Sequence, residues 1–95
     1  FNAAKLAERE ASRLVEQGNM GPAREACARS LKFWPDFPCA YFTLAITWFE
    51  TDPARAREYF EKFETAYAKF GYQYLDSEDN MKALPDFKAR LNTAP

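Results

Sequence analysis

The sequence predicts an all-α fold made of antiparallel helix-turn-helix repeats, and three observations lead to this prediction. Apolar positions recur 34 residues apart (7 to 41, 11 to 45 and 14 to 48), so that Ala7, Ala11 and Leu14 are followed by Tyr41, Ala45 and Trp48. A helix-breaking turn lies inside each unit, at residues 17–19 and again at 51–53. On both sides of each turn, apolar residues have helical spacing. A period of about 34 residues with two helices per unit is typical of an α-solenoid.

The chain has 95 residues, which corresponds to a single domain over 1–95. We expect a first repeat over residues 4–37, a second over 38–70, and a C-terminal cap over 71–95. Because the chain opens at Phe1 rather than at a methionine, one interpretation is that it is a piece of a longer protein.

The first repeat contains two predicted helices, one over residues 2–17 and one that ends before Pro35. Asn2 is a suitable N-cap for the first helix, and Gly18 suits the left-handed conformation that ends it. The apolar stripe of this helix contains Leu6, Ala7, Ala11, Leu14 and Val15. Its charged residues are predicted to face solvent. Pro22 fits the first turn of the second helix, where its missing N–H has no cost.

The second repeat begins with an unusually apolar helix, predicted over residues 38–50. It carries two apolar stripes, with Tyr41, Leu44, Ala45 and Trp48 in one and Phe42, Ile46 and Phe49 in the other. A helix that is apolar nearly all round must be covered on both sides. The following helix is predicted over residues 53–70, with Gly71 after its end. Its buried face is predicted to contain Ala56, Tyr59, Phe60, Phe63 and Tyr67.

The C-terminal segment is predicted to pack on the second repeat as a cap. Asp76 or Ser77 is a suitable N-cap for a helix over residues 78–84, and Pro85 then breaks the helix or opens a short one that reaches Leu91. The apolar residues of the segment are Tyr72, Tyr74, Leu75, Met81, Leu84, Phe87 and Leu91. The acidic residues near its start fit a helix N-terminus better than a calcium loop, because the glycine and the distal glutamate of such a loop are missing.

The composition argues against several classes of function. The chain has no histidine, which excludes His-based triads and imidazole metal sites, and we predict no catalytic residue, no metal and no cofactor. A net charge of −1 does not provide the positive surface that nucleic-acid binding needs. An RNA contact through Arg24, Arg29 and Lys32, beside Phe33 and Trp34, is the alternative. No apolar run approaches the roughly 20 residues that span a bilayer, so no membrane segment is predicted.

The two cysteines, Cys27 and Cys39, do not have the spacing of a zinc site. One interpretation is that both are small buried hydrophobic residues. The other is a disulfide between neighbouring helices, which would imply an oxidising compartment. The compartment stays open, with the cytoplasm favoured.

The two repeated units resemble the tetratricopeptide repeat (TPR) family. Residues 17–19 match the turn between the A and B helices of that family, Ala23 its small residue early in the B helix, and Pro35 its closing proline. Ser30-Leu31 stands where the family usually has Ala-Leu, and the second unit matches through Tyr41, Leu44, Ala45, Trp48, Ala56, Phe60 and Phe63. The resemblance covers residues 4–70. Since Phe63 replaces a small residue and the second turn is one residue shorter, we expect the next helix to pack differently.

The resemblance implies that the A helices line a concave face that holds an extended peptide or a partner helix. The residues expected there are Lys5, Glu8, Ser12 and Val15 from the first A helix, and Cys39, Phe42, Ile46 and Phe49 from the second. The set of lysines and asparagines with which some members grip a C-terminal carboxylate is not found at these positions. We therefore expect an apolar groove that binds a protein or peptide partner, in a module without enzymatic activity.

Two alternative interpretations of the chain's function involve the same predicted groove. In the first, residues 72–91 fill the groove, and the domain is a structural module of a larger protein. In the second, the groove is the contact between copies of the chain, and the protein is a homo-oligomer.

Overall fold

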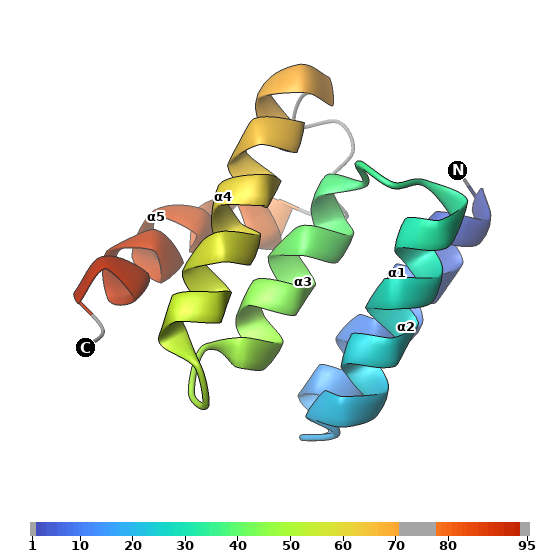
Figure 1. Ribbon diagram of the computed structural model, residues 1–95, viewed down its shortest axis with the longest axis horizontal. Helices are drawn as coiled ribbons and strands as arrows, with labels where there is room; N and C mark the ends of the chain where they lie inside the picture. The colour runs from blue at the N-terminus through green and yellow to red at the C-terminus, as the bar shows by residue number, and fades with distance from the viewer. Residues whose placement is uncertain (1, 71–77, 94–95) are drawn as a thin grey trace.

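The computed structural model describes residues 2–70 and 78–93, all of whose regular elements are helices (Figure 1). These are α1 (Asn2–Glu16), α2 (Met20–Phe33), α3 (Pro38–Trp48), α4 (Pro53–Phe70) and α5 (Glu78–Thr93). The all-α prediction is therefore confirmed. The predicted roles of Gly71, Tyr72, Tyr74, Leu75, Asp76 and Ser77 lie outside the described residues, as do the side chains of Met81 and Leu84.

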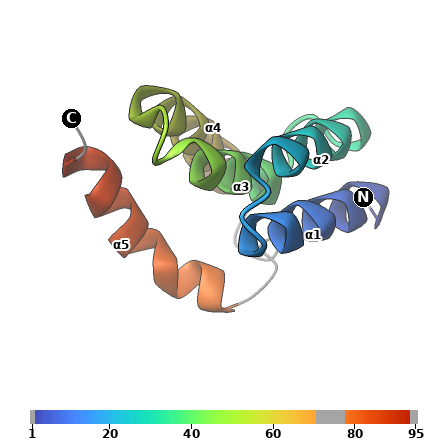
Figure 2. The same cartoon turned by 90° about the horizontal axis from the view of Figure 1, so that it is seen from below.

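The helices form two antiparallel pairs followed by a single helix. Helix α1 pairs with α2 and α3 pairs with α4, and both helices of the first pair also contact α3 (Figure 1). Seen from below, α2 and α4 lie along one side of the molecule, α1 and α5 lie on the other side, and α3 lies between them (Figure 2). This arrangement makes α3 the central helix of the fold.

Most of the local helix signals act as predicted. Gly18 has a φ of +80°, the left-handed conformation that follows the end of α1. Helix α4 has the predicted bounds, and Asp52 Oδ1 accepts a hydrogen bond from the backbone N–H of Arg55 at 3.2 Å, as an N-cap does. Helix α3 ends at Trp48 rather than at residue 50, because the Phe49 N–H donates to the carbonyl three residues back, on Ile46. Asn2 is the first residue of α1 rather than its N-cap.

The predicted break at Pro85 is wrong. Helix α5 runs without interruption from Glu78 to Thr93, so that Pro85 lies inside it. Proline removes one hydrogen bond from a helix interior, a cost that tertiary packing can offset. Here that packing comes from the second half of the helix, where Phe87 and Leu91 join the core cluster formed by α3 and α4.

The predicted apolar stripe of α1 is wrong at one position, and so is the solvent exposure predicted for Glu8. Leu6 is 65% exposed, whereas Glu8 is only 2% exposed. The buried face of α1 contains the small residues Ala4, Ala7 and Ala11, which let neighbouring helices approach closely. The Ser30 hydroxyl of α2 donates a 2.7 Å hydrogen bond to the Ala4 carbonyl, which fixes this close pairing. The rotation of α1 that buries the alanines turns Glu8 towards α3 and Leu6 towards solvent.

Helix α3 is covered on both sides, as predicted. On one side Phe42 and Ala45 join Ala56, Phe60 and Phe63 of α4 and Leu91 of α5. On the other side Leu44 packs with Ala11 of α1 and with Ala26 and Cys27 of α2. Cys27 and Cys39 are both buried thiols that form no disulfide, so they act as small hydrophobic residues and the disulfide alternative is wrong.

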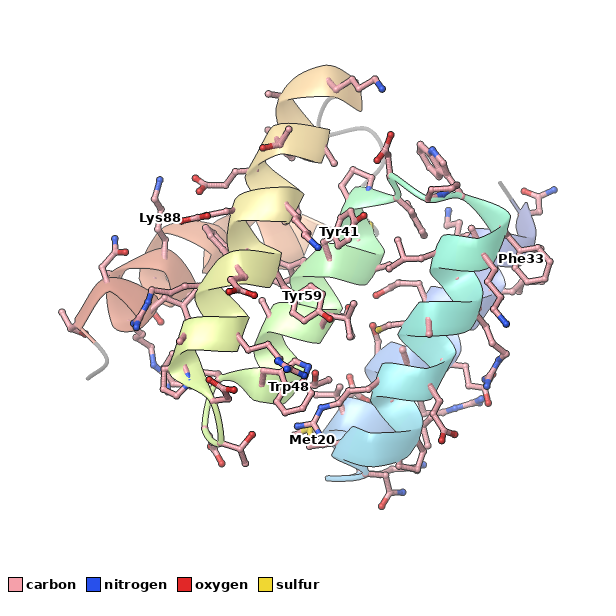
Figure 3. All side chains as sticks on the ribbon, viewed as in Figure 1. Met20, Phe33, Tyr41, Trp48, Tyr59 and Lys88 are labelled. Carbon is pink, nitrogen blue, oxygen red and sulfur yellow. The ribbon has the colours of Figure 1, made fainter. Side chains whose placement is uncertain are left out.

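A stack of cationic and aromatic side chains ties the first pair to the second. The Arg24 guanidinium lies 3.6 Å from the ring centre of Trp48, and the Arg55 guanidinium lies 4.7 Å from it. Trp48 lies in the space between α3 and α2 (Figure 3). Arg24 Nη2 also donates to the Thr47 carbonyl at 2.6 Å. Arg29 is paired with Glu10 at 3.1 Å, so two of the three basic residues considered for an RNA contact already have partners within the protein.

Candidate functional site

A groove of about 170 Å³ lies between α1 and α3, and we call it the α1–α3 groove. It is lined by Glu8, Ser12, Val15 and Glu16 of α1 and by Cys39, Phe42, Thr43 and Ile46 of α3. In each helix every lining residue has another one three or four positions away, so the set lies on one helix face. The groove brings together six of the eight residues expected on the concave face: Glu8, Ser12, Val15, Cys39, Phe42 and Ile46.

The other two expected residues lie elsewhere. Phe49 comes after the last residue of α3 and lines a second cavity of about 300 Å³, together with Met20, Thr47, Phe87 and Arg90. Its ring centre is 5.5 Å from that of Phe87, and the Arg90 guanidinium lies 4.9 Å from it. Lys5 is half-buried and lines neither cavity. Ile46 lines both cavities and therefore lies at the boundary between them.

Sequence reasoning missed two residues of the groove, Glu16 and Thr43. Thr43 is buried, and its hydroxyl donates a 2.7 Å hydrogen bond to Glu8 Oε1. The same oxygen accepts a 2.8 Å hydrogen bond from the Ser12 hydroxyl. The available signal was the combination of Glu8 and Ser12 four residues apart with a threonine, Thr43, on a highly apolar helix. Two hydroxyl donors make the burial of a carboxylate possible, since a buried charge must be hydrogen-bonded.

The walls of the groove differ in chemical character. Val15, Phe42 and Ile46 provide apolar surface, while both of its ionisable carboxylates, Glu8 and Glu16, belong to α1. No lysine or arginine is among the described residues that line it. The groove is therefore apolar with an anionic side rather than uniformly apolar.

Helix α5 covers a different part of α3. Phe87 of α5 lies 5.5 Å from Phe42 and 5.7 Å from Phe60, measured between ring centres. Lys88 of α5 forms a 2.8 Å ion pair with Glu64 of α4. Among the α5 side chains that the structure describes, residues 86–93, none lines the α1–α3 groove. These side chains thus cover the α3–α4 side of Phe42. The part of the groove-filling alternative that concerns the side chains of residues 72–85 lies outside the described residues.

Cys27 provides a test of how well this region excludes water. Burial, with a smaller contribution from the negative charge of Glu8, raises the pKa of its thiol to about 12. The unfolded thiol has a pKa of about 8.5. Above that pH the unfolded chain loses a proton that the folded chain retains, so the free energy of unfolding falls by up to about 1.4 kcal/mol per pH unit.

We expect this fall to appear in urea unfolding of the wild-type protein between about pH 8.5 and about pH 12, and to be smaller by the Cys27 contribution in Cys27→Ala. The difference between the two proteins isolates the thiol from the other groups that titrate in this range. Identical pH dependence for both would mean that Cys27 is accessible to water in the folded state.

Comparison with protein-family models, with characterised proteins and with solved structures gave no match. Within the described residues, none of the helices combines the length and apolar character needed to cross a membrane.

Proposed function

We propose that this chain is a TPR-like interaction module, without catalytic activity, that holds a peptide or a partner helix in the α1–α3 groove. The observation that supports this proposal is the convergence of six expected residues on one groove, between the first helices of two antiparallel pairs. In a TPR-like arrangement those helices line the ligand-binding face. Helix α5 acts as the cap, since it occupies the far side of α3 and α4.

The burial of each groove residue decides whether its substitution can test binding separately from folding. Phe42 belongs to the core cluster, so its replacement would change folding and binding together. Val15 and Ile46 are only half-buried and line the groove, so they are the better probes of binding. Leu6 provides a matched control, because it is an exposed apolar residue of α1 outside the groove.

The experiment selects binders to the chain from a phage-displayed library of short random peptides and measures their affinity by fluorescence anisotropy. Val15→Ser and Ile46→Ser are each expected to weaken binding by about tenfold or more, because burying an aliphatic side chain contributes about 1.5–3 kcal/mol and a factor of ten corresponds to about 1.4 kcal/mol. Leu6→Ser should bind like the wild type. A library that yields no binder, or binders that are insensitive to both groove variants, would contradict the proposal.

Self-association is the second candidate function, and the exposure of two large apolar side chains favours it. Leu6 is 65% exposed and Phe33 is 60% exposed, and Phe33 points away from α3 and α4 (Figure 3). Sedimentation velocity at several concentrations tests this candidate. A concentration-dependent dimer that is lost in Leu6→Ser or Phe33→Ser would support it, and a monomer throughout would exclude it.

A further inference from the structure

The α1–α3 groove has the shape and charge of a site for one long basic side chain. Its volume of about 170 Å³ is below the roughly 300–1,000 Å³ of sites that hold a drug-sized ligand, so it suits one side chain rather than a larger group. A single side chain that projects from a bound peptide or helix can enter such a groove.

The apolar part of the groove suits the stem of such a side chain. Phe42 and Ile46 of α3 and Val15 of α1 provide surface on which methylene groups can pack. Lysine commonly buries its stem in this way while its charged end stays near water. A purely aliphatic side chain would also contact this wall, so the apolar residues alone do not select lysine.

The charged part of the groove favours a basic side chain over an aliphatic one. Glu16 is exposed at the groove and takes part in no ion pair with another described residue, so its carboxylate is available to a ligand. Glu8 is buried and is held by Ser12 and Thr43, so it contributes through its charge. A charge in a poorly solvated position has a stronger field than one in open water. With no basic residue in the described lining, that field favours a cation and disfavours a carboxylate.

We propose that the α1–α3 groove binds a lysine side chain of a protein partner, with the stem on Phe42, Ile46 and Val15 and the ammonium at Glu16. The inference rests on the proposed function, since it names the chemistry of the partner in the same groove. It assigns the direct ion pair to Glu16 and the supporting field to Glu8.

The test uses peptides selected on the full chain from the phage-displayed library. We expect the binders to share a lysine next to an apolar residue. Synthetic versions with norleucine in place of that lysine keep the stem and lose the charge, and they should bind about tenfold more weakly. Glu16→Gln should weaken the lysine peptide to a similar extent and leave the norleucine peptide unchanged, which is the coupling that a double-mutant cycle detects. Glu25→Gln, an exposed glutamate of α2, is the matched control.

The outcomes separate this inference from the proposed function. If lysine and norleucine peptides bind equally while Ile46→Ser weakens both, the lysine assignment is wrong and the groove remains the binding site. Binders that share a carboxylate instead of a cation would also overturn the assignment. If the lysine matters but Glu25→Gln has the same effect as Glu16→Gln, the peptide responds to overall charge and the assignment fails. If no binder depends on Val15 or Ile46, both proposals fail.

Discussion

Replacing Phe42 by alanine is expected to lower the free energy of unfolding by about 3–5 kcal/mol, the range for truncating a buried aromatic residue. Phe42 is 5% exposed and lies at the centre of the aromatic cluster. Its ring centre is 5.2 Å from that of Phe63 and 5.5 Å from that of Phe87, so it contacts both α4 and α5. Urea unfolding followed by far-UV circular dichroism would measure the loss.

Phe33→Ala is the matched control for this prediction. It removes the same side chain from a position that is 60% exposed, where changes are usually within about 0.5 kcal/mol. Comparable losses in the two variants would show that the aromatic cluster around α3 is not the core of the fold.

Replacing Leu91 by alanine is expected to lower the free energy of unfolding by about 2–5 kcal/mol and to loosen α5 from the rest of the domain. Leu91 is 1% exposed and belongs to the same cluster as Phe60 and Phe63. Its carbonyl accepts a 3.0 Å hydrogen bond from Arg57 of α4, which adds to the attachment. Amide hydrogen exchange over residues 86–93, measured together with urea unfolding, would detect local loosening in addition to global destabilisation.

Thr93→Ala is the control for Leu91→Ala, because the Thr93 hydroxyl is exposed and its hydrogen bonds to other described residues are to carbonyls of its own helix, on Ala89 and Arg90. It should exchange and unfold like the wild type. The packing of α5 described above would be wrong if Leu91→Ala left both the exchange of α5 and the stability of the protein unaltered.

The helix boundaries could largely be predicted from the sequence because their signals are local. Gly18 after α1 and Pro53 at the first position of α4 each act within one turn of the backbone. The continuity of α5 could not be predicted in this way. Proline disfavours a helix interior locally, and what compensates for it is the contact of Phe87 and Leu91 with residues of other helices.

The residues of the groove were predicted in part for the same reason. Helical periodicity places Glu8, Ser12 and Val15 on one face whatever packs against them. The burial of Glu8 depends on Thr43, which lies 35 residues away in the sequence, so no local pattern contains it. The position of Phe49 outside the groove depends on where α3 ends and on how α5 packs against Phe49. Both are set by tertiary contacts.

The hydrogen bond between Thr43 and Glu8 has a consequence for how rigidly the two helix pairs are aligned. Sliding α1 along α3 by one turn, about 5.4 Å, would preserve much of the contact between alanines and apolar residues, but it would separate these two groups. The buried carboxylate would then lose a hydroxyl donor, which is unfavourable in a poorly solvated position. The bond therefore fixes the position of α1 along α3. A ligand that enters the groove meets walls whose alignment is already fixed, and it does not have to supply the free energy of aligning them.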